Sequence, residues 1–573
     1  MSLFGALSLA GSGLAAQQTG LQVTGNNIAN AGTDGYSRQV ANLVPGGSQE
    51  LAPGQFIGAG VSISSIQRQT NEAINESLRN ASSDQSGSQT LSSYLGRVES
   101  TFGALSDNDL SGRMSDFFNG FSTLATNPGD LAQRSVVIQS GSSLANYMQG
   151  LRGQLTAIRT DAQSQVTTLV GQADSLCKTV ANLNQQISTT EAGQGGANSL
   201  RDQRDQALGQ LAQLMDIKVI DTGNGLVNVL VGSQPVVNGT TSRGIAYTNV
   251  TDPTGQFNNT QLTFADNGDR MQTSGGTIGA LIDARDNYVT PAITTLDTMA
   301  AGLINAVNTI HTQGQGMTGF STVTSATQVS DPTQALNAGK LATNISFPPK
   351  NGTFNLYLTD ATTGQTTTKQ ISVNLSGQGT QTTLNTLAAS ISAAGGGTVT
   401  ATVNANGKMV ISSSDTNVTF GFGEDSSGAL SSLGINTFFT GSDSSDVAVN
   451  STLLTDPAML AAGRNNVPGS NANVQALALG GSAAVSQLSG KSLTDFYSQY
   501  IGSLAAASKN AADNVTTQTA IHDTIFAQQQ SVSGVSMDEE ALNLTKYQRA
   551  FQGTARFISV VDDMMQTVLG LIK

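Results

Sequence analysis

The 573-residue sequence contains one cysteine, two histidines and no tryptophan. The single cysteine, Cys177, excludes an intrachain disulfide and a metal site built on two cysteines, and we interpret it as a buried structural thiol. The histidines, His311 and His522, lie on separate helical patterns, and neither has a second histidine or a cysteine at zinc-ligand spacing. We expect His311 to pack at a helix end. The sequence therefore predicts no metal site and no cofactor.

Basic charge and long apolar runs are also scarce. Only 11% of the residues are charged, and the formal net charge of -13 argues against nucleic acid or an anionic membrane as partner, because either would need a basic patch. No run approaches the roughly 18 apolar residues of a spanning helix. Gly, Ser and Gln interrupt the start of the chain, where a cleaved secretory signal would be continuously apolar. We therefore expect no membrane insertion and no cleaved signal peptide.

The motifs that could indicate an enzyme do not fit their required context. Residues Gly314–Gly319 match G-x-G-x-x-G, but they follow a predicted helix and no helix pattern opens after them, so we interpret them as a loop. Asp562 and Asp563 are adjacent on a helical pattern, with Asp562 at the seam, so their carboxylates do not face each other. The sequence predicts no catalytic residues and no enzyme.

Both ends of the chain carry apolar residues every seven positions, which is typical of amphipathic helices with one apolar face. Ser536 and Glu539 fit a capping box at the start of the C-terminal helix. The N-terminal segment contains five glycines, each costing about 1 kcal/mol in a helix interior, so it should be largely unfolded alone. We predict that the two ends pair, although packing of each end on the body of a monomer is the alternative. On the C-terminal helix the alternate seam positions are Ala541, Gln548, Ala555 and Asp562.

We predict an assembly interface on these ends and on the turn after the first helix. Arg38 in that turn is equally compatible with a solvated residue. The predicted interface residues are Leu3, Leu7, Leu14, Leu21, Ile28, Asn30, Tyr36, Arg38, Met537, Leu544, Phe551, Ile558, Met565 and Leu569.

The middle of the chain alternates between helical and strand patterns. Helical patterning dominates from about Ser64 to Asp216, with a break at Asn127–Asp130, and returns from Leu493 towards Ile525. Strands and turns are expected at 218–272, before a helix at 277–312. A second β-rich part contains a short helix at 384–391 and a hairpin signal at Asn406-Gly407. The predicted fold class is mainly α with β-rich insertions (α+β).

Motifs at the two ends resemble one known family. The N-terminal motif is Asn26–Gln39, and the C-terminal motifs are Gly534–Glu540, Tyr547–Phe551 and Val560–Met565. They resemble those of bacterial flagellar axial proteins, and the Gly-Tyr-Ser-Arg-Gln ending of the first narrows the resemblance to the flagellar hook-associated protein 1 family, FlgK. The resemblance implies a structural adaptor that joins hook to filament, self-assembles through its terminal helices and permits flagellin polymerisation.

The resemblance also implies a layered arrangement of discontinuous nested domains. The terminal helices would pair as a coiled-coil-like inner layer, a helical bundle would form the middle layer, and a β-rich domain would lie outside. The expected domains are 1–35 plus 536–573 as the terminal inner-tube domain, disordered in the monomer; 36–345 plus 442–535 as the helical rod domain, with a β insertion near 217–275; and 346–441 as the outer α+β domain.

The partners that the resemblance implies are copies of the chain in a ring, the hook protein, a second hook-filament junction protein, and a cytoplasmic export chaperone at the C-terminal helix. Export would use the flagellar type III channel and lead to the extracellular flagellum. Two alternatives stay open. One is another flagellar axial protein, such as a hook subunit or a flagellin-like protein, and the other is a secreted binding protein or enzyme.

Overall fold

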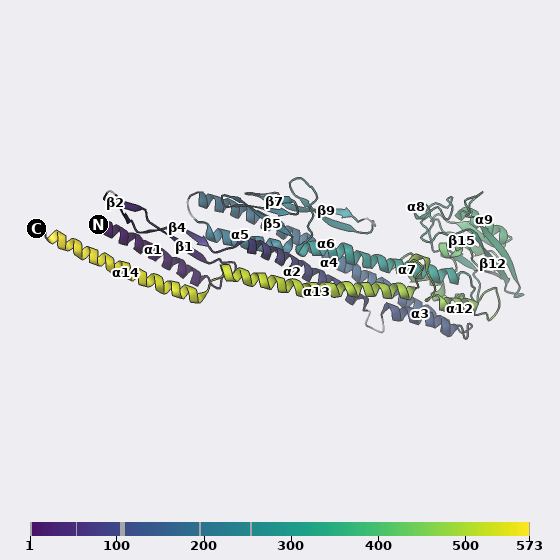
Figure 1. Cartoon of the computed structure of the whole chain (residues 1–573). Coiled ribbons are helices and arrows are strands. Elements are labelled where there is room, and N and C mark those ends of the chain that lie inside the picture. Colours follow the sequence, from purple (N-terminus) through teal and green to yellow (C-terminus); the bar gives the residue numbers. More distant parts are fainter. Residues whose placement is uncertain (1–2, 53, 104–108, 194–195, 253–254, 572–573) are drawn as a thin grey trace. The chain divides into compact units, whose positions relative to one another are not determined.

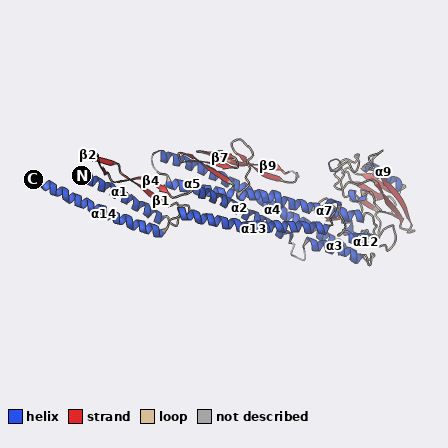
Figure 2. Ribbon diagram, viewed as in Figure 1, coloured by secondary structure: helices blue, strands red, loops and turns tan. Residues whose placement is uncertain are grey.

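The computed structural model describes residues 3–52, 54–103, 109–193, 196–252 and 255–571 of the chain. The chain forms two compact units, each built from segments far apart in the sequence. Unit 1 comprises Met1–Ser93, Asp161–Arg285 and Lys509–Lys573, and unit 2 comprises Tyr94–Thr160 and Asp286–Ser508. Helices dominate and the sheets are small and antiparallel (Figures 1 and 2). The predicted mainly helical fold with β-rich insertions is confirmed.

Four helical elements contribute residues to both units. They are α2 (Glu72–Phe102), α4 (Leu131–Ala192), the π-helix η1 (Ala284–Val289) and α13 (Leu493–Ser533).

The remaining elements of unit 1 are four helices and several small antiparallel sheets. The helices are α1 (Leu3–Ala29), α5 (Asn198–Leu214), α6 (Gly276–Asp283) and α14 (Met537–Gly570). The strands are β1 (Gln39–Pro45), β2 (Ser48–Ala52), β3 (Gln55–Gly58), β4 (Val61–Arg68), β5 (Ile217–Gly223), β6 (Leu226–Val231), β7 (Gln234–Asn238), β8 (Thr241–Ser242), β9 (Ile245–Thr251) and β10 (Asn258–Phe264). They pair as β1-β4, β2-β3, β5-β6-β7-β8 and β9-β10.

Unit 2 combines helices with two three-stranded sheets. The helices are α3 (Leu110–Leu124), α7 (Thr290–His311), α8 (Lys340–Thr343), α9 (Leu384–Ala394), α10 (Ala429–Leu433), α11 (Ser451–Thr455), η2 (Pro457–Met459), α12 (Ala472–Leu479) and η3 (Ser486–Leu488). The strands are β11 (Thr322–Thr324), β12 (Gly352–Asp360), β13 (Thr366–Val373), β14 (Val399–Val403), β15 (Met409–Ser413), β16 (Val418–Gly423), β17 (Phe439–Thr440) and β18 (Ala448–Val449). They pair as β11-β15-β14, β13-β12-β16 and β17-β18.

The long helix α4 keeps one face buried along its length because its buried residues repeat every eleven positions. An eleven-residue interval corresponds to about 3.67 residues per turn, close to that of an unstrained helix. Cys177 belongs to this buried stripe and is fully buried, as the sequence predicted. The stripe includes Met148, Leu151, Leu155, Arg159, Ala162, Val166, Val170, Ala173, Cys177, Ala181 and Asn184.

The ribbon β1-β4 was not predicted, and the helical pattern expected from Ser64 onwards is wrong at its start. Residues 61–68 form β4, which pairs antiparallel with β1. The register shifts between Asn42 and Leu43, because Asn42 opposes Ser65 whereas Leu43 opposes Ile63. This bulge breaks the strict alternation of apolar and polar residues that identifies a strand in sequence.

The β-rich part of unit 2 has its own core. The predicted hairpin is present as β14-β15, with Gly407 in the turn at a φ of +67°. Side chains from both three-stranded sheets pack with α9 and α10 in one cluster. The same cluster contains Phe320, Val329 and Leu336, which precede the expected start of the outer domain at 346. This core therefore begins before β11, whereas the sequence pattern placed its start at 346.

Candidate assembly surface at the paired terminal helices

Helices α1 and α14 of unit 1 pair in antiparallel orientation (Figure 1). Asn27 near the end of α1 hydrogen-bonds Glu540 near the start of α14. Gly20, seven residues earlier, faces the ring of Tyr547, seven residues later. Contacts that move in opposite directions along two helices define an antiparallel pair. The predicted pairing of the chain ends is confirmed.

Gly20 lets the two helices approach closely. A Cβ at this position would lie 2.7 Å from a carbon of the Tyr547 ring, closer than real Cβ contacts. The glycines that weaken an isolated helix thus also provide room for α14 at this point. The buried residues of α1 are small or polar, with Val23 the largest aliphatic among them. They are Ala10, Ala16, Gly20, Val23, Thr24 and Asn27.

The predicted apolar positions flank this buried face. On α1, all five are only partly buried; these are Leu3, Leu7, Leu14, Leu21 and Ile28. On α14, four are partly buried, namely Leu544, Phe551, Ile558 and Met565. Met537 and Leu569 are 52% and 66% exposed. The subunit alone therefore leaves much of this apolar surface uncovered.

Buried residues on α14 recur at multiples of seven positions, as predicted. They are shifted by one residue, however, from the alternate seam positions that the sequence indicated. The buried residues Glu540 and Val561 stand one position before Ala541 and Asp562, and Asp562 is exposed. Placing Asp562 at the seam was wrong. The inward positions on α14 include a tyrosine and a glutamate, which hydrophobicity alone does not identify.

A buried polar network around Asn27 joins the motifs of the two chain ends. The Asn27 amide nitrogen donates to Glu540 Oε2 at 3.1 Å and to the Gln39 carbonyl oxygen at 2.9 Å. Its amide oxygen accepts from the Gln39 backbone N–H at 3.0 Å and from the Tyr36 hydroxyl at 2.8 Å. Asn27 and Glu540 are each 1% exposed. The amide of Asn27 uses both donors and its acceptor oxygen twice, so this buried group is fully hydrogen-bonded.

Arg38 provides the positive charge of this network. Its Nε donates to Glu540 Oε1 at 2.9 Å, and its Nη1 lies 2.9 Å from Glu539 Oε2. Its backbone N–H donates to the Ser533 carbonyl oxygen at 2.9 Å. A buried carboxylate such as that of Glu540 needs a nearby cation and hydrogen bonds to offset its desolvation. Arg38 is thus bound within its own chain, and it is not the solvated turn residue of the alternative interpretation.

Tyr36 and Asn30, the other predicted residues of the turn, have different environments. Burial, and then the negative charges of Asp202 and Glu540, raise the pKa of Tyr36 to about 12, so its hydroxyl remains a hydrogen-bond donor. Asn30 is partly exposed, and its side chain donates to the Asn26 carbonyl oxygen at 2.9 Å. Tyr36 belongs to the buried network, whereas Asn30 completes the end of α1.

The start of α14 is defined by residues of the second motif. The Ser536 hydroxyl accepts the Glu539 backbone N–H at 3.4 Å, which is the N-cap half of the predicted capping box, whereas the Glu539 carboxylate lies 2.9 Å from Arg38 Nη1. A Cβ on Gly534 would collide with the Gln530 carbonyl oxygen at the end of α13. Glycine is therefore required where the chain leaves α13.

His311, which could suggest a catalytic or metal-binding role, has a structural role in unit 2. His311 is fully buried at the end of α7, where Nδ1 lies 2.8 Å from the Asn436 carbonyl oxygen and Nε2 accepts the Ala461 N–H at 3.0 Å. Burial lowers the pKa of His311 to about 4. Within the described residues, no group of three or more His, Cys, Asp or Glu side chains could hold a metal ion. No helix in the described part of the chain is long and apolar enough to cross a membrane.

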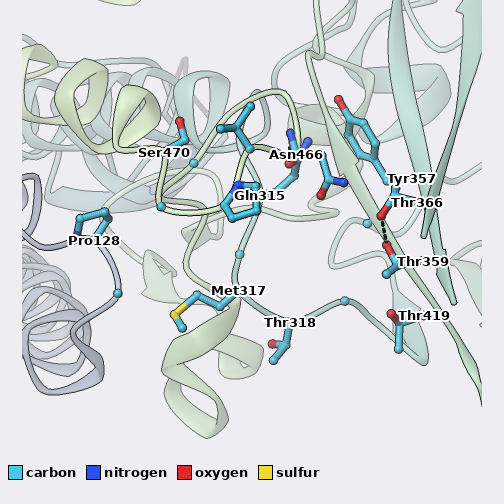
Figure 3. A pocket seen from close by; sticks show the side chains of 18 of the residues that line it. Pro128, Gln315, Met317, Thr318, Tyr357, Thr359, Thr366, Thr419, Asn466 and Ser470 are labelled. Atoms are coloured by element: carbon cyan, nitrogen blue, oxygen red, sulfur yellow. Dashed lines mark hydrogen bonds between the residues drawn. The ribbon is translucent and has the colours of Figure 1, made fainter. Parts of the chain in front are cut away.

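The G-x-G-x-x-G segment is a loop that runs closely between two other backbone segments. Gln315 exchanges backbone hydrogen bonds with Gly463, and a Cβ on Gly316 would lie 2.6 Å from the Ala458 carbonyl oxygen. This loop borders a cleft of about 740 Å³ that is lined by Gln315, Met317 and Thr318 of the loop and by Tyr357, Thr359 and Thr419 of the strands (Figure 3). The glycines serve backbone packing.

Family models of flagellar proteins match three parts of the chain. The flagellar hook-associated protein FlgK helical domain matches residues 95–325, the C-terminal part of the flagellar basal body rod FlgEFG proteins matches 528–571, and the flagella basal body rod protein matches 7–36. The last two matches include most of α1 and α14, together with Asn27, Tyr36 and Glu540 of the polar network.

Similar proteins extend this match over the whole chain. Flagellar hook-associated protein 1 of Salmonella typhimurium and that of Escherichia coli K12 are each 27% identical and aligned over 98% of both chains. The Bacillus subtilis protein of the same name is 31% identical over 38% of this chain and 44% of its own. Over its full length this chain is therefore similar to the flagellar hook-associated protein 1 family. It is a structural protein of the bacterial flagellum and not an enzyme.

The fold agrees with a solved structure described as the flagellar hook junction protein FlgK from Burkholderia pseudomallei. The TM-score is 0.52 at 16% sequence identity, and the match covers 80% of this chain and 100% of that one. At this identity the likeness concerns the fold. The sequence-based assignment to the FlgK family is confirmed by the relatives aligned over the full chain.

Proposed function

We propose that this chain is the adaptor that joins the flagellar hook to the filament, assembles through its terminal helices and allows flagellin to polymerise beyond it. The observation that carries this proposal is the buried network of Asn27, Arg38 and Glu540, which ties the family motifs of both ends together. This network fixes α1 against α14 and so fixes which apolar residues point outward. A defined outward face is what a repeating helical assembly requires.

The outward apolar residues of α14 support assembly with neighbouring copies. Val560, Met564 and Leu569 are 55%, 54% and 66% exposed. Each buried apolar side chain contributes about 1.5 to 3 kcal/mol, and these side chains do not supply that stabilisation in a lone subunit. The pair α1/α14 should therefore open in purified subunits and close when neighbours cover this face.

Limited proteolysis of the purified subunit tests this coupling of folding to assembly. We expect protease to remove residues 1–35 and 536–573 while the rest of the chain resists. The same segments should be protected in isolated flagella. Equal protection of both segments in the free subunit would contradict the coupling and favour packing of the ends on a monomer.

Within this proposal the chain is organised in three layers. Residues 1–35 and 536–573 form the inner tube, and the rod domain surrounds it, with the β insertion near 217–275. We place the start of the outer α+β domain at about 320, because Phe320 shares its core. Its partners are copies of itself in a ring, the hook protein and the second junction protein. Before export through the type III channel, a chaperone would cover the apolar face of α14.

Deletion of the gene in its host, followed by electron microscopy and an assay of flagellin in the medium, tests the junction role. We expect bare hooks and flagellin lost to the medium. The full-length gene should restore filaments, and a gene ending before Ser536 should not. Normal filaments in the deletion strain would refute the proposal, and loss of the hooks themselves would indicate a hook subunit.

A pair of substitutions separates the terminal helices from the rest of the surface. Leu14→Asp places a charge on the partly buried apolar stripe of α1 and should reproduce the deletion phenotype. Tyr247→Asp changes a 45% exposed side chain on the β9-β10 ribbon and should leave filaments intact. Equal effects of the two variants would contradict a specific role for α1.

A further inference from the structure

Unit 1 contains an apolar notch beside the paired terminal helices. The notch has a volume of about 340 Å³ and lies between α1, the base of the β1-β4 ribbon and α14. Ala10 and Gly13 of α1, Val61 of β4, and Gly553 and Phe557 of α14 contribute to its lining. Phe557 is 42% exposed. Small residues thus leave a recess that is bordered by one large aromatic ring.

The same unit carries a solvent-exposed aromatic side chain. Phe56 on β3 is 66% exposed. It stands opposite Glu50 of β2 in the hairpin register, and cross-strand partners have their side chains on the same face of a ribbon. Glu50 accepts the Gly54 N–H at 3.1 Å, and no Lys or Arg nitrogen among the described residues lies within 4.0 Å of its carboxylate. The hairpin therefore presents an aromatic ring next to a negative charge.

The surface near the notch has the complementary charge. Lys546, Arg549 and Arg556 lie on the exposed part of α14. Among the residues that the structure describes, none of these three cations lies within 4.0 Å of a carboxylate oxygen. Arg556 precedes Phe557 and stands three residues after Gly553, so it flanks the notch.

We infer that Phe56 of one copy inserts into the notch of the adjacent copy, with Glu50 approaching Arg556. A head-to-tail contact needs two different, complementary surfaces on one chain, and the hairpin and the notch are such a pair. The volume is sufficient, since an engineered cavity of about 150 Å³ already binds benzene. A buried aromatic side chain in a pocket with a charged rim is also the usual form of an interface hot spot. This inference rests on the proposed self-assembly and specifies one contact within it.

Cysteine cross-linking in assembled flagella tests this contact. Two differently tagged genes, one with Phe56→Cys and one with Phe557→Cys, are expressed together in the deletion strain, and isolated flagella are oxidised. A mixed disulfide between the two tags can form only between copies. The native Cys177 is fully buried and provides little background. Met564→Cys is the matched control, because it is 54% exposed on α14 but outside the notch.

We expect the mixed dimer of Phe56→Cys with Phe557→Cys to exceed that with Met564→Cys at least about tenfold. Equal or absent cross-linking in flagella that carry normal filaments would overturn the inference and leave the junction role intact. Cross-linking of Phe557→Cys to another flagellar protein in place of a copy would overturn it as well. Failure of the wild-type gene to restore filaments would instead count against the proposed function.

If cells that express the two cysteine variants do not build filaments, single substitutions test the proposed Phe56 contact. Phe56→Ser should lower the number of filaments per cell about tenfold, because it removes the inserted ring from an exposed position that the isolated subunit does not need. Tyr247→Ser, on another exposed ribbon of the same unit, should have no such effect. Similar filament numbers for the two variants would overturn the inference.

Discussion

The buried histidine of unit 2 makes the stability of the protein depend on pH in a calculable way. The pKa of His311 is about 4 in the folded chain, compared with about 6.5 in an unfolded one. The unfolded state therefore binds the proton first as pH falls. The contribution of neutral His311 is complete above about pH 6.5 and is lost progressively towards about pH 4, and the full difference amounts to about 3 kcal/mol.

The comparison of the wild type with His311→Gln isolates this effect from all other titrating groups. Glutamine cannot take up a proton in this range and can replace at most part of the hydrogen bonds to Asn436 and Ala461, so the variant should be less stable at about pH 7. At about pH 4.5 the gap between the two proteins should shrink by roughly 2 kcal/mol. Urea unfolding followed by circular dichroism at both pH values measures the two gaps.

The reasoning is refuted if the gap stays constant between the two pH values. It is also refuted if nuclear magnetic resonance shows the His311 ring gaining its proton near pH 6.5. The measurement is practical because the chain has only two histidines, and the spectrum of His311→Gln assigns the signal.

Three further predictions concern the terminal pair and the buried thiol. Arg38→Met should reduce filament formation by leaving the Glu540 carboxylate buried without its cation, at a cost of about 3 kcal/mol, and Glu540→Gln added to it should restore filaments in large part. Gly20→Ala should cost about 1 to 3 kcal/mol of helix pairing by overpacking and lower the filament count, whereas Gly25→Ala, whose Cβ meets nothing within 4 Å, should not. Burial raises the pKa of Cys177 to about 12, so a thiol reagent at pH 8 should modify it only as fast as the chain unfolds, as mass spectrometry would show.

The sequence was sufficient for the parts of the fold that local patterns control. The interval of seven residues predicted the terminal helices, and Ser536 marked the start of α14 because a cap depends on neighbours within one turn. The hairpin at Asn406-Gly407 followed from turn chemistry. In each case the decisive contacts link residues that are close in sequence.

The polar network could not be predicted because its partners are remote in the chain. Asn27 and Glu540 are separated by 513 positions, and nothing local to either residue indicates the other. The same applies to the seam of α14, where Tyr547 faces inward because Gly20 makes room for its ring. Hydrophobic periodicity predicts how often residues of one helix face the other. In this pair, glycine and buried hydrogen bonds determine which residues those are.

The small and polar residues buried between α1 and α14 affect how copies of the chain can assemble. If only apolar side chains packed between the two helices, the leucines of α1 would be buried against α14. Little apolar surface would then be left to contact neighbouring subunits. Because small and polar residues occupy the buried face, Leu7, Leu14 and Leu21 stay partly exposed on its flanks. The hydrogen bonds of Asn27 then fix the register at one end, so that the same apolar face is presented by every copy. A polar seam therefore serves specificity within the subunit, and the apolar stripe beside it is free to supply affinity between subunits.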